Sequence, residues 1–188
     1  IPGTIDAGKY DVFEGGIGKN LAYLDVTSAN SGNFRMEESV DASSNTNEGA
    51  MVGSIAAAEW LEYTVNVAQS GLYSFAFRYA SGNSKGGGPF HLELDGQIIS
   101  GDISVPSTSS TVWTIWATKT VSSIPLTEGE HVLRLAFSAG EFNLGKMTFV
   151  RTGDLVTSYP VANAGSNLKV VLPLTSANLD GTASSESA

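Results

Sequence analysis

Apolar and polar residues alternate along most of the chain, and no stretch shows a convincing helical spacing of apolar residues. The clearest stretch is 60–67, in which Leu61, Tyr63, Val65 and Val67 share one face while polar residues take the other. Successive side chains of an extended strand point to opposite faces. The stretch therefore predicts a strand with one buried face.

The same alternation predicts further strands. A strand at 72–79 follows the first one after a short polar turn, so we expect the two to form a hairpin. Asp95 and Gly96 have the sequence of a type I′ turn and predict a second hairpin. The other predicted strands cover residues 21–24, 51–55, 90–94, 97–99, 113–121, 131–137 and 146–150.

Many short strands and no covering helices predict an all-β fold, a β-sandwich of jelly-roll type with two antiparallel sheets. The polar, glycine-containing segments 41–49 and 81–89 are predicted to be loops. Several aromatic residues lie on faces with period two and are predicted to be core: Trp60, Tyr63, Phe75, Phe77 and Phe137.

The pattern changes after Arg151 and predicts three parts. Residues 1–151 form the sandwich, 152–160 a linker, and 161–188 the truncated start of a further module. The last part offers a strand, a turn and a strand, which is too little to close a core of its own.

Composition excludes several classes of function. The chain has no cysteine, so disulfides and thiol chemistry are excluded. A formal net charge of −9 repels phosphate and anionic lipid headgroups, so neither nucleic acid nor a membrane is expected as a partner. The low charged fraction of 15% suits a neutral ligand. Ile1–Thr4 lacks the features of a signal peptide, so a leader would precede this sequence.

Several motifs occur in one order along the first part: IDAGKY at 5–10, EWLEYTVNV at 59–67, WTIW at 113–116, EGEHVLRL at 128–135 and GEFNL at 140–144. Together they resemble carbohydrate-binding module family 6 from Ile1 to about Arg151. Residues 162–165 (ANAG) and 179–181 (LDG) resemble the start of a polycystic-kidney-disease-type (PKD) Ig-like domain.

The resemblance implies a secreted, extracellular, non-catalytic module that binds a polysaccharide and is joined to a glycoside hydrolase. The usual ligand site of the family lies in the loops at one edge of the sandwich, and a concave sheet face can carry a second one. Aromatic rings stack on the apolar face of a sugar, and an asparagine bonds to its hydroxyl groups.

Trp113 is the predicted stacking ring, because it follows the polar run 106–111 where a loop becomes a strand. Trp116 is three positions further on, and an odd spacing along a strand predicts the opposite face, in the core. Asn143 matches the asparagine of the family's Phe-Asn-Leu motif. The alternative is an ordinary turn residue after Gly140.

Ser54 stands where the family carries a second aromatic ring, within Val52-Gly53-Ser54-Ile55. A serine cannot stack on a sugar. Either a ring such as Tyr23 or Phe34 replaces the missing one, or the site is open on that side.

The resemblance also implies a structural calcium ion, for which Asp6 is the candidate ligand. Gly8 and Gly145 stand where the family tends to offer further oxygen ligands, so the predicted site is depleted. His91 and His131 have no metal-binding spacing.

Catalysis has little support, because the acidic pairs Glu37-Glu38 and Glu59/Glu62 are typical of solvated surface and the chain has no G-x-S-x-G motif. A small glycoside hydrolase or lyase domain and an adhesion module that binds protein are the alternatives. The insert at 15–49 resembles modules of agarases and laminarinases. It favours agarose or a β-1,3-glucan such as laminarin, with recognition of chain ends.

Overall fold

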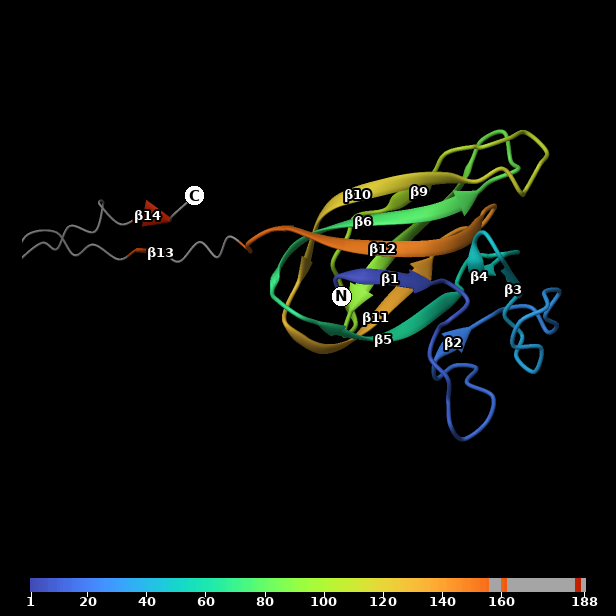
Figure 1. Cartoon of the computed structure of the whole chain (residues 1–188), viewed down its shortest axis with the longest axis horizontal. Coiled ribbons are helices and arrows are strands. Elements are labelled where there is room, and N and C mark those ends of the chain that lie inside the picture. The colour runs from blue at the N-terminus through green and yellow to red at the C-terminus, as the bar shows by residue number, and fades with distance from the viewer. Residues whose placement is uncertain (156–159, 162–184, 187–188) are drawn as a thin grey trace, which may run out of the picture. The chain divides into compact units, whose positions relative to one another are not determined.

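The structure is a computed structural model that describes residues 1–155, 160–161 and 185–186 (Figure 1). Within these ranges the chain forms strands and no helix, and so no helix that could cross a membrane. The strands are β1 (Gly3–Asp6), β2 (Tyr23–Leu24), β3 (Ala42–Asn45), β4 (Gly49–Val52), β5 (Trp60–Val67), β6 (Gly71–Ala80), β7 (Gly87–Leu94), β8 (Gln97–Ile98), β9 (Ile103–Val105), β10 (Ala117–Leu126), β11 (Gly129–Phe137), β12 (Asn143–Gly153), β13 (Pro160–Val161) and β14 (Ser185–Glu186).

Strands β1 to β12 form two antiparallel sheets. The first sheet has the order β10-β6-β12-β4-β3, and β1 pairs with β12. The second has the order β2-β5-β11-β7-β8, and β9 pairs with β7. Figure 1 shows the sheets as two layers of one sandwich. The predicted all-β sandwich of two antiparallel sheets is confirmed.

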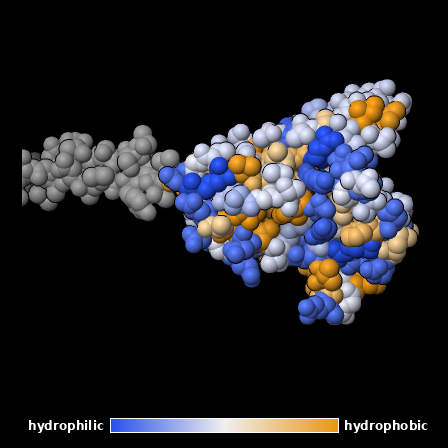
Figure 2. All heavy atoms as spheres, in the orientation of Figure 1, coloured by the Kyte–Doolittle hydropathy of each residue, from blue (hydrophilic) through white to orange (hydrophobic). Residues whose placement is uncertain are grey.

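Phenylalanine rings fill the space between the sheets. Phe75 on β6 lies 4.9 Å from Phe149 on β12 and 5.2 Å from Phe77, measured between ring centroids. Phe77 meets Phe90, on β7 of the other sheet, at 5.3 Å. All four side chains are fully buried. Burial of each stabilises the fold by about 1.5–3 kcal/mol, in a chain that has no disulfide. On the face drawn in Figure 2, apolar residues appear in separate groups among polar ones.

The period-two pattern predicted most of the core correctly. Along β5 the alternate residues from Leu61 to Val67 are buried, and the predicted core residues Tyr63, Phe75, Phe77 and Phe137 are buried too. Trp60 is a correction, because it is only half-buried. It precedes the buried Leu61, so its side chain takes the outer face of the sheet, where the Arg134 guanidinium lies 4.4 Å from the ring.

The hairpin predicted between β5 and β6 is wrong. β5 pairs with β2 and β11, whereas β6 pairs with β10 and β12 in the other sheet. The short connection crosses between the sheets, and the Arg151 guanidinium fixes it by donating to the Ser70 carbonyl at 3.0 and 3.1 Å. The hairpin predicted at Asp95-Gly96 is confirmed, with φ angles of +49° and +78° and with β7 paired to β8.

Two segments predicted as loops contain strands. Residues 41–49 form most of an edge hairpin, in which Ser43 pairs with Met51. Only Ala42 of the four β3 residues is buried, so no apolar period marks the strand. The second loop ends at Gly86, where β7 follows. Conversely, the strand predicted from residue 113 begins at Ala117.

The chain divides into two compact units, Ile1–Asp154 and Leu155–Ala188. β12 continues to Gly153, so the predicted linker at 152–160 begins with strand residues. In the second unit β13 pairs with β14. The PKD-type start predicted for 161–188 lies mainly outside the described residues and stays a prediction.

We expect that deletion of residues 161–188 leaves the thermal unfolding midpoint of the sandwich unchanged, because the core described above lies within Ile1–Asp154. Calorimetry of the full and shortened chains measures this. A midpoint lowered by many degrees would show that the second unit completes the fold.

Candidate functional site

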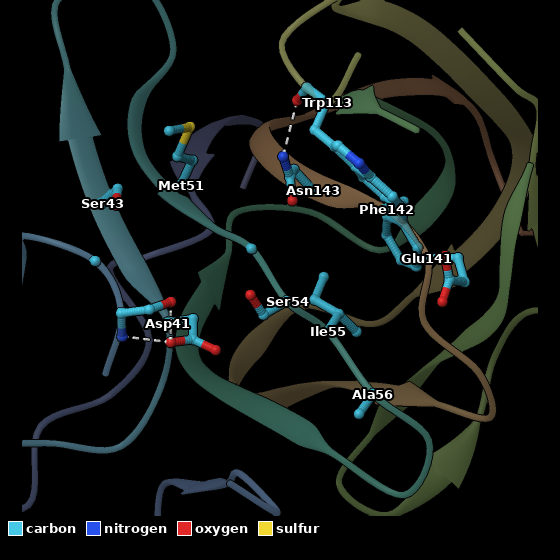
Figure 3. A pocket seen from close by; sticks show the side chains of 13 residues that line it. Asp41, Ser43, Met51, Ser54, Ile55, Ala56, Trp113, Glu141, Phe142 and Asn143 are labelled. Atoms are coloured by element: carbon cyan, nitrogen blue, oxygen red, sulfur yellow. Dashed lines mark hydrogen bonds between the residues drawn. The ribbon is translucent and has the colours of Figure 1, made fainter. Parts of the chain in front are cut away.

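A cleft of about 630 Å³ lies among loops and strand ends of the sandwich (Figure 3). Segments far apart in the sequence build it: the 31–43 region, the start of the 53–58 loop, the turn before β10 and the start of β12. The lining residues are Ser31, Gly32, Asp41, Ser43, Met51, Gly53, Ser54, Ile55, Ala56, Trp113, Glu141, Phe142 and Asn143.

Trp113 forms one wall of the cleft. It lies in the turn before β10, and 39% of its surface is exposed although it is a large apolar residue. A Cβ atom at Gly82 would lie 2.8 Å from three atoms of the indole ring, so the ring packs directly on the Gly82 backbone. An exposed ring with one face supported leaves its other side for a ligand.

The sequence predicted that Trp113 and Trp116 point to opposite faces of one strand. In the structure both residues precede β10, so this argument from strand geometry does not apply to them. Trp116 is half-buried rather than part of the central core. Its ring lies against Gly145, where an added Cβ would be 3.2 Å away.

Asn143 is the first residue of β12 and lies beside Trp113. Its Nδ2 donates a hydrogen bond of 2.9 Å to the Trp113 carbonyl oxygen. The amide still has one N–H and its Oδ1 to offer, and Figure 3 shows Oδ1 turned toward the cleft. A Cβ at Gly53 would lie 3.0 Å from Oδ1, so the glycine gives this amide its space. One side chain thus fixes the tryptophan turn and presents polar groups to the cleft.

Ser54 and Glu141 line the cleft in left-handed backbone conformations, with φ of +50° and +68°. Such conformations cost a residue other than glycine about 1 kcal/mol or more. The Ser81 hydroxyl holds the second residue by donating to the Glu141 carbonyl at 2.8 Å. Ser54 is exposed and its hydroxyl points into the cleft (Figure 3), as its predicted place in the site requires.

Tyr23 is a correction to the predicted site. It is fully buried on β2 and packs edge-on against Tyr10 at 5.3 Å, so its ring cannot reach the cleft. Phe34 is partly buried against the core and does not line the cleft either. Among the described lining residues, Trp113 and the buried Phe142 are the aromatic ones. The cleft therefore has one exposed ring.

Asp41 is a site residue that the sequence did not reveal. It is 8% exposed, and its Oδ1 accepts hydrogen bonds from the Ser31 amide at 2.5 Å and the Ser31 hydroxyl at 2.6 Å. These bonds leave Oδ2 for a donor in the cleft. Asp41 immediately precedes β3, whose residues show no apolar alternation, so no local pattern in the sequence pointed to this residue.

Three glutamates of the acidic pairs that were considered for catalysis, Glu38, Glu59 and Glu62, are bonded to other groups of the protein. Glu38 pairs with Arg35 at 2.6 Å, and Glu62 bonds to Arg134 on the outer sheet face. Glu59 is buried, and burial raises its pKa. Its two oxygens accept from the Val26 and Ala56 amides at 3.2 and 2.9 Å, which ties down the loop behind the cleft. These carboxylates therefore stabilise the fold.

A calcium ion takes about six to eight oxygen ligands, of which the described surroundings of Asp6 offer few. The Asp6 carboxylate faces the Lys9 ammonium at 3.4 Å, and an added Cβ at Gly8 would meet Ala50 at 3.1 Å. Added at Gly145, it would lie 3.5 Å from a Glu48 oxygen. The described residues contain no group of three or more His, Cys, Asp or Glu side chains placed to hold a metal. Calcium binding stays a prediction of the resemblance.

Comparison with known proteins identifies the fold and the family. Residues 31–151 match the family model described as "Carbohydrate binding module (family 6)". No curated protein gives a significant match.

Among solved structures, the cellotriose complex of the family 6 module from Cellvibrio mixtus lichenase 5A is 25% identical. It has a TM-score of 0.57, and the match covers 81% of this chain and 98% of that one. The C-terminal family 6 module of LamC, a marine laminarinase from Zobellia galactanivorans, is 24% identical with a TM-score of 0.58 and coverages of 79% and 98%.

A β-1,3-glucan-binding family 6 module from Bacillus halodurans is 20% identical, with a TM-score of 0.53 and coverages of 79% and 96%. These likenesses agree with the sandwich described above. The family match spans more than half of the sequence, and this chain therefore belongs to carbohydrate-binding module family 6.

Proposed function

We propose that the cleft beside Trp113 binds a neutral polysaccharide, and that the module thereby directs a secreted glycoside hydrolase, joined to it in the parent protein, to its substrate. The observation that carries this proposal is the pairing of Trp113 with Asn143. An exposed ring stacks on the C–H face of a pyranose, while the adjacent amide bonds to its hydroxyl groups. The 2.9 Å bond between the two residues fixes their relative positions.

The composition of the cleft suits a neutral sugar. Apart from Trp113 and Asn143, it offers the Ser54 hydroxyl and the free oxygen of Asp41, each suited to bonding with a hydroxyl group. Sugar hydroxyls can donate to the carboxylate and exchange hydrogen bonds with the serine. The module's own part is therefore binding, and cleavage falls to the joined enzyme.

A β-1,3-glucan is the preferred ligand within this proposal, and agarose is the other candidate. The named relatives include a module from a marine laminarinase and one that binds a β-1,3-glucan. The insert at 15–49, which favoured these two polysaccharides, contributes Ser31, Gly32, Asp41 and Ser43 to the cleft.

Replacement of Trp113 by alanine should weaken glycan binding by about tenfold to a hundredfold and leave folding intact, because the ring is exposed and outside the core. Isothermal titration calorimetry with laminarihexaose and neoagarohexaose measures the affinity. Gly82→Ala is a second variant, since its new methyl group would displace the ring. Val112→Ala removes a neighbouring exposed side chain that does not line the cleft, and it should bind as the wild type does. Wild-type affinity in the Trp113 variant with an unchanged melting curve would remove the ring from the site.

We further propose that the cleft holds the end of a glycan chain. A single exposed ring makes binding weak, with a Kd of about 10⁻⁴ M. Calorimetry on a ladder of laminari-oligosaccharides should show affinity that levels off after about two or three sugars, with one module bound per intact polymer chain. Affinity that rises steadily with length, and many modules per chain, would show that an internal segment binds.

A further inference from the structure

Glu141 lines the cleft in a backbone conformation that is unfavourable for a glutamate. Its φ of +68° suits glycine, yet the residue is a glutamate whose exposed side chain lines the cleft. The neighbouring Phe142 is buried in the core, so Glu141 and Asn143 flank it on the cleft side. A glycine here would relieve the backbone but would leave this end of the cleft without a polar side chain.

The carboxylate of Glu141 is oriented rather than free. The Asn83 Nδ2 donates to its Oε2 at 3.2 Å, which leaves Oε1 for another donor. Figure 3 shows Glu141 and Asp41 on opposite sides of Ser54 and Ile55. The cleft thus has a carboxylate toward each side, with the polar groups of Ser54 and Asn143 nearby.

No positive group balances these two carboxylates inside the cleft. Among the described residues that line it, none is Lys, Arg or His. The chain as a whole carries a formal charge of −9. A sulfate or uronate group that entered the cleft would therefore meet like charge without a basic partner, whereas a hydroxyl group could donate to either carboxylate.

We propose that Glu141 is a specificity-determining residue, which accepts a hydrogen bond from a hydroxyl of the bound glycan and excludes anionic glycans from the cleft. This inference rests on the proposed function, since it assigns a role within the same site. The two residues then have different roles in the cleft. Trp113 stacks on any pyranose, and Glu141 selects among pyranoses by their charge.

The test compares the wild type with Glu141→Gln and Glu141→Gly by calorimetry. Laminarihexaose and neoagarohexaose are the neutral probes, and their sulfated counterparts are the anionic ones. Both variants should bind the neutral probe about tenfold more weakly, because a charge-assisted hydrogen bond is lost. Both should bind the sulfated probe more tightly than the wild type does. This gain should shrink between about 0.02 M and about 0.5 M salt, because salt screens the repulsion.

Two controls separate this role from other effects. Glu130→Gln removes the same charge from an exposed position on β11 outside the cleft, and it should change neither affinity. Glu141→Gly should also raise the unfolding midpoint, because glycine adopts the left-handed conformation without strain.

The outcomes distinguish two failures. If the wild type binds a neutral probe and both Glu141 variants bind every probe as the wild type does, Glu141 has no role in selection and this inference is overturned. If Glu130→Gln changes selectivity as much as the Glu141 variants do, general surface charge is the cause, which also overturns it. If the wild type binds none of the probes, the proposed function itself fails.

Discussion

The packing of aromatic rings between the two sheets is the constraint on which the cleft depends. Phe142, the residue between the two cleft residues Glu141 and Asn143, is buried and stacks on Phe90 at 5.6 Å. Phe90 in turn packs against Phe77 of the opposite sheet. The segment that leads into β12 is therefore anchored in the core, and the residues on either side of Phe142 are held in the cleft. In a chain without cysteine, this burial keeps the cleft residues in fixed positions.

From this anchor the site extends outward through hydrogen bonds. Asn143 holds the carbonyl of Trp113, and the indole ring packs on the backbone of Gly82. Ser31 orients Asp41 on the other side of the cleft. A rigid cleft with one exposed ring binds with little loss of conformational freedom, but it gains little stacking energy. If sugar binds here as we propose, low affinity and selection by hydroxyl pattern and charge would follow from the same arrangement.

The sequence predicts the sandwich well, because a strand with one buried face leaves a period-two pattern, as from Leu61 to Val67. The family motifs also predicted Trp113, Asn143 and Ser54 as site residues, and the structure brings all three to one cleft. It failed where the pattern carries no information. Alternation shows which face is buried but not which strands pair, so β5 and β6 were joined wrongly.

Other failures have equally physical causes. The sequence allowed the Tyr23 ring to be a candidate for sugar stacking, because no residue near it in the sequence indicates that Tyr10 packs against it in the core. Asp41 and Glu141 lie in polar segments whose convergence depends on contacts distant in the sequence. The left-handed conformation of Glu141 could not be predicted from the sequence, because this backbone conformation is typical of glycine and not of glutamate.

We propose that sugar binds in the cleft between Trp113, Asn143 and Asp41. The most direct measurement is an NMR titration of the labelled module with the oligosaccharide that it binds. If sugar binds in this cleft, the signals of the Trp113 indole N–H, the Asn143 side-chain amide and the backbone amides around Ser54 should shift together with one dissociation constant. Shifts confined to the outer sheet face around Trp60, with the cleft signals unmoved, would contradict it.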